Sequence, residues 1–559
     1  MRETSWFAGP LGRRFPSREL TSSLLVSPAM ESIAQQRWQR FKKYYREYPD
    51  IGLSLDISRM AFDEAALEAL RPKFESAFEE MRQLEAGSIA NKDENRMVGH
   101  YWLRAPHLAP TKEIREAITT TRQHIESFVK RVHSGEVRGQ NGLFRHILLI
   151  GIGGSALGPQ FVSDALAESK STPMSISFLD NTDPDGMDRV FDSIPDLGTT
   201  VCLVVSKSGG TKETRNGMVE AMHRYQSLGL RFADHAVAIT GAGSELDNLA
   251  VKQQWIARFP MWDWVGGRTS ETSAVGVLPA MLQHIDVELL ISSSANCDSI
   301  TRIADFDTNP AAILASAWHL AGSGKGLRDM VVLPYSDRLV LFSRYLQQLV
   351  MESLGKSHDR NGNRVYQGLA VYGNKGSTDQ HAYVQQLRDG IDNFFVTFIE
   401  VRGIIRTETT FVETKLQSAD FLAGLLHGTR EALTESGRQS ITITIDRVSA
   451  KSVGVLIALF ERAVGLYASL INVNAYHQPG VEAGKQAAAG YLATHLDVMQ
   501  WFDSNPSAEA TVEAVAAGIG RSDLVESVMR ICRNLEQRRT IRQVDIGKVG
   551  PNTRFKSAL

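Results

Sequence analysis

Cysteine is scarce in this chain. Three cysteines occur among 559 residues, Cys202, Cys297 and Cys532, and they form neither a C-x-x-C pair nor a metal-ligand spacing. This usage excludes a disulfide framework and is typical of a reducing compartment. Cys202 lies inside an apolar run, so we predict that it belongs to the core.

The chain also lacks a dominant charge and an uninterrupted apolar run. Its 61 Lys and Arg against 63 Asp and Glu give a net charge of −2 at pH 7. That balance gives no reason to expect nucleic acid or a charged membrane as a partner. The most apolar stretch, 454–471, carries Glu461 and Arg462 in its middle. We therefore predict a core helix there and no membrane span.

A Walker A loop, G-x-x-x-x-G-K-[ST], is absent, but two other glycine-rich turns are present. The first lies in HILLIGIGGSALGP, residues 146–159, where an apolar run of strand length precedes glycines, Ser155 and a helix start. This order presents backbone N–H groups to an anion. Ala156 satisfies only the looser dinucleotide-binding pattern, so nucleotide binding stays open on this segment alone.

The second glycine turn lies in TTVCLVVSKSGGTKET, residues 199–214. After a buried-strand run, three hydroxyls gather around Gly209 and Gly210: Ser206, Ser208 and Thr211. Hydroxyls donate hydrogen bonds directly, and glycines let the backbone approach an anion closely. The segment predicts a cradle for one phosphate. An ordinary serine-glycine loop with a helix cap is the alternative.

A proton-transfer group is suggested by SRYLQQLVMESLGK, residues 343–356. Four apolar residues share one face of the predicted helix: Leu346, Leu349, Val350 and Leu354. Gln348 and Glu352 lie four residues apart and project from one face. A carboxylate beside an amide suits a general base whose pKa is raised by an apolar wall of Val350, Met351 and Leu354. On this pair alone, a surface Glu is the commoner explanation.

Three more segments contribute candidate groups. VGGRTSETSAVG, residues 265–276, places Arg268 behind two glycines, and AYHQPGVEAGKQ, residues 475–486, contains Gln478 and Lys485. An arginine suits the stabilisation of a developing oxyanion. His381 lies in GSTDQHAYVQQL, where a residue of 377–379 can cap a helix. A helix N-terminus favours neutral imidazole. Taken singly, each of these is more often a surface polar group.

The order of apolar patterns predicts an α/β fold. Helical periodicity covers 30–48, 61–84 and 111–135, and strand-like runs follow at 146–150, 176–180, 201–205, 236–240, 329–333, 393–401 and 440–445. This rhythm predicts two doubly wound parallel-sheet halves with a break near 285–325. The glycine turns then follow strands, where such sheets bind ligands.

The two ends of the chain differ from the middle. Residues 1–29 are rich in Arg, Ser and Thr, as in a transit peptide, but Glu3 and Glu19 count against one. We predict a disordered tail before Met30. Beyond 490, two short helices at 507–519 and 524–537 and a small strand at 540–544 predict a small helical appendage. Its lack of a strongly basic face disfavours nucleic-acid binding.

Seven segments together resemble the glucose-6-phosphate isomerase (phosphoglucose isomerase) family, in its bacterial and plastid branch. They run in the family's order from about residue 50 to 490: LLIGIGGSALGP, DNTDPD, VVSKSGGTKET, VGGRTS, YLQQLVMESLGK, DQHAY and QPGVEAGK. Two departures occur. Gly209 and Gly210 stand where many relatives carry an aromatic residue or Thr, and GSTDQHAY replaces a commoner N-G-Q-H run.

The resemblance implies interconversion of glucose 6-phosphate and fructose 6-phosphate through a cis-enediol, without cofactor or metal. It makes Glu352 the base, Arg268 the group that stabilises the enediolate, His381 the ring-opening group and Lys485 its partner at the ring oxygen or C1 hydroxyl. It assigns six residues to substrate binding: Ser155, Ser206, Ser208, Thr211, Gln348 and Gln478.

The resemblance also implies a homodimer in which His381 reaches the site of the neighbouring subunit. Five regions are expected: a tail 1–29, an N-terminal helical region 30–140, two sugar-isomerase domains at 141–300 and 301–490, and an appendage 491–559. We expect a cytoplasmic protein, or a plastid stromal one if 1–29 is a transit peptide. Two other functions stay open: an isomerase of another hexose phosphate, and a non-enzymatic sugar-phosphate sensor.

Overall fold

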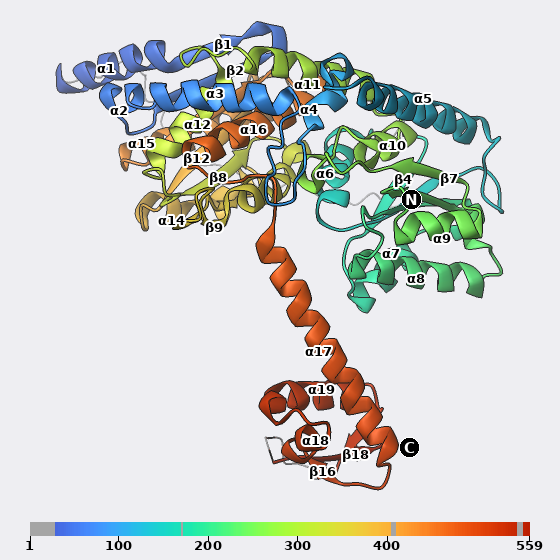
Figure 1. The fold of residues 1–559 in the computed structure, drawn as a ribbon. Helices are drawn as coiled ribbons and strands as arrows, with labels where there is room; N and C mark the ends of the chain where they lie inside the picture. The colour runs from blue at the N-terminus through green and yellow to red at the C-terminus, as the bar shows by residue number, and fades with distance from the viewer. Residues whose placement is uncertain (1–27, 169–171, 404–409, 545–549, 551, 559) are drawn as a thin grey trace, which may run out of the picture.

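The computed structural model describes residues 28–168, 172–403, 410–544, 550 and 552–558. Two α/β halves lie side by side, and one long helix leads from them to a small C-terminal unit (Figure 1). This architecture confirms the predicted fold class. The predicted tail before Met30 lies outside the described residues, except that α1 begins at Pro28.

The first half contains a five-stranded, wholly parallel sheet of order β4-β3-β5-β6-β7. Its strands fall on the predicted runs: β3 (His146–Ile150), β4 (Ser175–Leu179), β5 (Thr200–Val205), β6 (Ala236–Thr240) and the added β7 (Ala257–Pro260). Successive residues of β3 and β5 face two different cores. Because helices cover both faces, the strands read as continuous apolar runs and not as alternating ones.

Helices on the two faces of this sheet build those cores. One core receives α5 (Lys112–Ser134), α6 (Leu157–Leu166) and α10 (Ala274–Leu282). The other receives α7 (Pro184–Ser193), α8 (Lys212–Ser227) and α9 (Glu245–Gln253). Thr111 caps α5 and Gly135, at φ 80°, ends it. The predicted helix 111–135 is thus confirmed almost to the residue.

The second half contains a six-stranded sheet of order β1-β2-β15-β12-β8-β11. Four strands are parallel. Three lie on predicted runs, β8 (Asp329–Pro334), β12 (Phe394–Val401) and β15 (Ser440–Ile445), and the fourth, β11 (Val371–Tyr372), was not predicted. The other two, β1 (Tyr45–Tyr48) and β2 (Leu53–Arg59), form a hairpin that adds antiparallel to β15. The N-terminal region therefore completes the sheet of the second half.

The predicted helix 30–48 is wrong at its C-terminal end, where this hairpin begins. Helix α1 (Pro28–Tyr44) stops before the predicted residue 48, and strands follow. The sequence LSLDISR alternates apolar and polar residues, which is the period of a strand. The predicted helix 61–84 also divides, into α2 (Glu64–Glu68) and α3 (Arg71–Glu85). Pro72 starts α3 and cannot continue a preceding helix.

Helix α16 (Ala450–Leu470) is the predicted core helix. It is long and apolar enough to cross a membrane, yet 89% of its most apolar window is buried inside the fold. It packs against α11 (Val287–Thr301), α12 (Pro310–Ala321) and α3. Two charged residues in its middle, Glu461 and Arg462, are buried and paired with charges from α3, α4 (His100–Arg104) and α11.

Shorter elements lie between the main strands and helices of the second half. They are α13 (Phe342–Leu346), β9 (Lys356–His358), β10 (Arg364–Gln367), α14 (Val384–Asp389), β13 (Phe411–Glu413), β14 (Leu416–Gln417) and α15 (Ser418–Glu435).

The C-terminal unit has a core of its own. Helix α17 (Pro479–Ser504) enters it, and α18 (Val512–Gly518) and α19 (Val525–Gln537) pack beside a small sheet of order β16-β18-β17. The strands are β16 (Ala510–Thr511), β17 (Ile541–Gln543) and β18 (Arg554–Ser557). Both predicted helices and the predicted strand are present. The unit is mixed α/β where we predicted a helical one, and α17 begins before the predicted boundary at 490.

Candidate active site

Two glycine-rich loops meet at the carboxyl end of β3. The turn Gly153–Ser155 follows β3, and the turn Gly267–Thr269 carries Arg268. A Cβ on Gly154 would lie 2.1 Å from the carbonyl oxygen of Gly267, so only glycine fits there. The Ser270 hydroxyl adds a hydrogen bond of 3.2 Å to the Gly154 carbonyl oxygen. The loop with Ser155 and the loop with Arg268 are therefore packed together.

The hydroxyl cradle forms one tight turn between β5 and α8. Ser206 is buried, accepts from the Gly209 amide at 3.2 Å and donates to the Thr211 hydroxyl at 3.3 Å. Ser208 is exposed and accepts from the Gly210 amide at 3.2 Å. Gly209 has φ 74°, and a Cβ there would lie 2.4 Å from the Leu246 amide nitrogen. The departure from the family pattern at 209 thus matches a backbone that requires glycine.

Glu352 and Arg268 form an ion pair of 2.6 Å, with side chains 22% and 6% exposed. The Arg268 guanidinium also donates to the carbonyl oxygens of Ala475 and His477, both at 3.0 Å, and to the Gln478 side-chain oxygen at 3.3 Å. One arginine therefore joins the predicted base to the segment that precedes α17.

The helix that carries Glu352 differs from the prediction in two ways. It is α-helical to Leu346 and becomes π-helical over Gln347–Glu352. The predicted apolar wall is absent, because Met351 is 41% exposed while Val350 and Leu354 are buried in the core. The Glu352 carboxylate meets a guanidinium instead. The predicted apolar face itself is buried: Leu346, Leu349, Val350 and Leu354.

Gln348 points to the first glycine loop. Its side-chain nitrogen lies 3.1 Å from the position that a Cβ on Gly153 would take. The glycine therefore leaves room for the amide of Gln348. This contact places Gln348 on the same side of the loop junction as the turn that carries Ser155.

Two predicted site residues lie apart from this group. His381 is exposed at the end of a 3₁₀ turn, Thr378–His381, and none of the hydrogen bonds or ion pairs found among the described residues links it to the other candidates. Lys485 is exposed on α17, which leads away from the two halves (Figure 1). The predicted cap at Asp379 instead accepts from the Asn374 and Lys375 amides.

Two lysines at the site were missed from the sequence. The Lys356 ammonium donates to the carbonyl oxygens of Glu352 at 2.7 Å and His477 at 3.0 Å. The Lys207 ammonium donates to those of Asp263 and Val265. Burial lowers the pKa of both, and that of Lys356 falls to about 8. Lys207 lies inside SKSGGT, and Lys356 lies inside MESLGK, four residues after Glu352. Their place in these motifs was the signal that could have identified them as candidate site residues.

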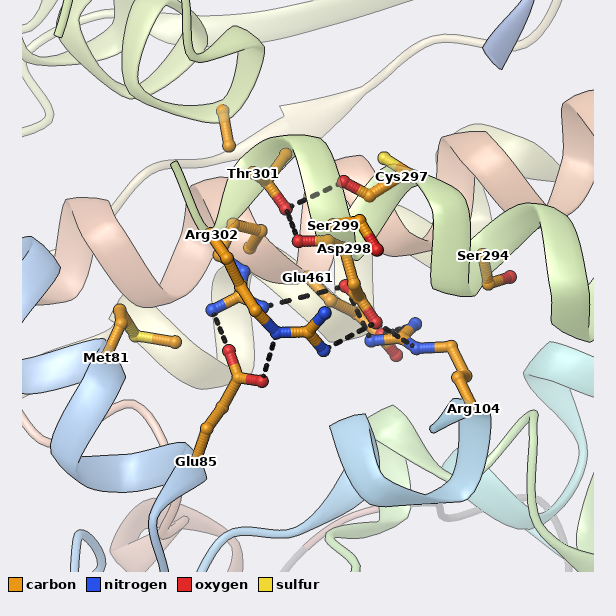
Figure 2. A network of polar contacts seen from close by, with 12 residues as sticks. Met81, Glu85, Arg104, Ser294, Cys297, Asp298, Ser299, Thr301, Arg302 and Glu461 are labelled. Carbon is orange, nitrogen blue, oxygen red and sulfur yellow. Dashed lines mark hydrogen bonds and ion pairs between the residues drawn. The ribbon is translucent and has the colours of Figure 1, made fainter. Parts of the chain in front are cut away.

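A cavity of about 110 Å³ lies beside Arg268 and Gln478, and Lys207, His100 and Glu461 also line it. Burial lowers the pKa of His100 well below its usual value and raises that of Glu461 to about 7. Glu461 belongs to a network of buried charges (Figure 2). Two arginines of that network, Arg104 and Arg462, act on His100.

The network in Figure 2 is built from arginines and carboxylates of four helices. Arg104 lies 2.6 Å from Glu461 and 2.8 Å from Asp298, and Arg302 and Arg462 both lie 2.6 Å from Glu85. Each buried charge thus has an opposite partner, which offsets part of its desolvation cost. The network ties α3, α4, α11 and α16 together beneath the site.

The fold and the site define a class: a two-half α/β protein with glycine-rich loops after its strands and a carboxylate–guanidinium pair. The family model described as phosphoglucose isomerase matches residues 56–512. The chain belongs to this family, as the motifs of the sequence indicated.

Individual relatives agree. The chain is 57% identical over 498 residues to a glucose-6-phosphate isomerase of Geotalea daltonii, covering 88% of this chain and 93% of that one. It is 56% identical over 513 residues to one from a Synechococcus strain, covering 90% and 95%. A solved glucose-6-phosphate isomerase of Chlamydia trachomatis superposes with a TM-score of 0.74 at 26% identity, covering 82% of this chain and 91% of that one.

Proposed function

We propose that this chain catalyses the reversible interconversion of glucose 6-phosphate and fructose 6-phosphate through a cis-enediol, in glycolysis and gluconeogenesis. The observation that carries the proposal is the Glu352–Arg268 pair at 2.6 Å, in a chain whose relatives named glucose-6-phosphate isomerase are 55–57% identical to it. An aldose and a ketose differ by the position of one carbonyl. Their exchange therefore needs a base that removes a proton at C2 and returns it at C1.

Glu352 is the proposed base and Arg268 the proposed electrostatic partner. A carboxylate on a rigid helical turn can serve both carbons, because C1 and C2 are adjacent. The enediolate gains negative charge at its oxygens, and a buried guanidinium that is already in place stabilises it without reorganisation. Arg268 is held by two backbone carbonyls, so its position does not depend on the substrate.

The phosphate is proposed to bind in the hydroxyl cradle. Ser206, Ser208 and Thr211 precede α8, a helix of 16 residues whose N-terminus attracts an anion. Ser155 contributes from the neighbouring turn. Gln348 and Gln478 are placed to contact sugar hydroxyls, because one lies against the first glycine loop and the other against Arg268.

Ring opening is proposed to need groups that the single chain does not bring to Glu352. His381 is exposed on its own subunit, which supports a homodimer in which it reaches the site of the partner subunit. Lys485 must approach by movement of α17. With this assignment the active unit is a symmetric dimer with two shared sites.

The compartment and the domain division are also proposals. All three cysteines are unpaired and buried, which supports a reducing compartment such as the cytoplasm, with the plastid stroma as the alternative. We propose sugar-isomerase domains at 141–300 and 301–490, with β1 and β2 added to the second.

Two alternative functions are less favoured. The relatives are named glucose-6-phosphate isomerase, which disfavours an isomerase of another hexose phosphate. A sensor is less favoured because binding alone needs no base.

A coupled assay tests this function in both directions. Fructose 6-phosphate formation from glucose 6-phosphate, and the reverse, should be fast without added metal or cofactor. Mannose 6-phosphate and glucosamine 6-phosphate serve as competing substrates. Faster turnover of mannose 6-phosphate or glucosamine 6-phosphate than of glucose 6-phosphate would favour an isomerase of another hexose phosphate. Tight binding of these sugar phosphates without turnover would favour a sensor.

A further inference from the structure

Lys356 is the one lysine described above that contacts the backbone of the proposed base. It begins β9, is 5% exposed, and donates to the carbonyl oxygens of Glu352 and His477. Arg268 also donates to His477, at 3.0 Å. The Lys356 ammonium and the Arg268 guanidinium, which come from distant segments, thus both donate to the carbonyl oxygen of the residue before Gln478.

We propose that Lys356 is a positioning residue, which ties the backbone of Glu352 to segment 475–478 and so holds the base and Gln478 in one geometry. This inference rests on the proposed function of Glu352 as the base. It adds a residue that acts through Glu352 and Gln478 and that has no assigned role in the reaction.

The partners of Lys356 distinguish it from a purely structural charge. The buried arginines of the network in Figure 2 face carboxylates, which offset the cost of burying them. The hydrogen bonds described for the Lys356 ammonium go to neutral carbonyls, and Arg268 lies close enough to oppose its charge. Such a placement costs stability. The two hydrogen bonds join the backbone of Glu352 to that of His477, which points to a role in the geometry of the site.

The charge of Lys356 should also make this geometry depend on pH. Burial, aided by the positive charge of Arg268, lowers the Lys356 pKa to about 8, while Glu352 and Asp93 oppose the shift. His477 also faces it, and burial lowers the pKa of that imidazole. The ammonium form is present below pH 8 and is lost as the pH rises through 8. Activity should therefore decline above about pH 8.

The test compares Lys356→Met, Lys356→Arg and the surface control Lys112→Met. Lys112 has a side chain 77% exposed and pairs with Glu116 on its own helix. For Lys356→Met we expect kcat to fall about 10- to 100-fold, because small displacements of reacting groups cost that much, with KM little changed. Hydrogen exchange at amides 474–478 should rise. Lys112→Met should match the wild type in both measurements.

Lys356→Arg keeps a charge at every pH used, since arginine does not titrate in this range. It should retain more activity than Lys356→Met, and its alkaline decline should move above that of the wild type. An unmoved decline in Lys356→Arg, or a kcat of Lys356→Met within twofold of wild type with unchanged exchange, would overturn the inference. The arginine variant also decides the matter if Lys356→Met fails to fold.

Failure of the proposed function gives a different result. If the wild type lacks isomerase activity, the function itself is rejected, whereas the exchange measurement still reports whether Lys356 holds 474–478. If the wild type is active, Glu352→Gln is inactive and Lys356→Met behaves as the wild type, only the role of Lys356 is rejected.

Discussion

The proposed site has two groups of residues in contrasting environments. Glu352, Arg268 and Gln478 are joined by an ion pair and hydrogen bonds, and the hydroxyl cradle lies on a loop of the adjoining sheet. His381 and Lys485 are exposed, on a short turn and on the long helix α17. Gln478 and Lys485 are only seven positions apart, yet one contacts Arg268 and the other lies on α17, which leads away from the two halves (Figure 1).

The contrast divides the proposed reaction into two parts. The single chain joins Glu352, Arg268 and Gln478, which are proposed to act in proton transfer and substrate binding. The groups proposed for ring opening would then need a second subunit and a movement of α17. The predictions below test this division, from the largest expected effect to the smallest.

Glu352→Gln should reduce isomerisation by about 10²-fold or more, because the amide keeps the shape of the side chain and cannot take a proton. Phosphate affinity and the melting temperature should stay near those of the wild type. Initial rates in the coupled assay check this. Glu116→Gln, which changes an exposed surface glutamate on α5, is the matched control. Activity of Glu352→Gln within a few fold of the wild type would remove Glu352 from the role of base.

The double variant Ser208→Ala, Thr211→Ala should raise KM for sugar phosphates by about tenfold or more. Each hydrogen bond to a charged oxygen contributes on the order of 1.5–3 kcal/mol. Ser227→Ala, at the exposed end of the same helix, is the control, since its hydroxyl bonds only to the Arg224 carbonyl. An unchanged KM in the double variant would place the phosphate elsewhere.

A mixture of Glu352→Gln and His381→Ala chains should regain about a quarter of wild-type activity. In a two-fold dimer with shared sites, each heterodimer has one site with both defects and one with neither. Random exchange makes half of the dimers heterodimers, and half of their sites are intact. The two inactive variants are denatured and refolded together, beside each alone. If both residues served the site from one chain, verified exchange would restore nothing.

The sequence predicted some strands of the fold better than others. The strands 146–150 and 236–240 were predicted to the residue, because strands buried on both faces are continuous apolar runs. The strand 440–445, which alternates Ile with Ser and Thr, was also predicted to the residue. The hairpin 45–59 was missed although LSLDISR alternates, and its pairing partner β15 lies almost 400 residues away. Local patterns do not encode such long-range pairing.

At the site, residue types and motif order predicted the candidate groups, but not the contacts that those groups make. Glu352 was expected against an apolar wall and instead pairs with Arg268, which comes from a segment more than 80 residues earlier. Lys356 was missed because its hydrogen bonds go to backbone carbonyls, which no side-chain pattern reveals. Helix α17 begins directly after Gln478, and no sequence pattern gives the direction in which it runs. The position of Lys485 could therefore not be predicted from the sequence.

The last prediction concerns α17. Residues 484–490 are exposed on every side, so the backbone around Lys485 is accessible, whereas Lys356 and Lys207 are shielded by the fold. Trypsin should therefore cut after Lys485 before it cuts after the buried Lys356 or the half-buried Lys207. If α17 brings Lys485 to a bound sugar phosphate, ligand at ten times its Kd should slow this cut by about tenfold, because cleavage then follows the remaining open population.

The control for this measurement is Lys415, which is exposed in the turn between β13 and β14 and belongs to no proposed site. Its cleavage rate should not change with ligand. Protection after Lys485 but not after Lys415 would mean that α17 brings Lys485 to Glu352, Arg268 and Gln478 when substrate binds. Equal rates after Lys485 with and without saturating ligand would mean that α17 stays extended, and Lys485 would then have no place in ring opening.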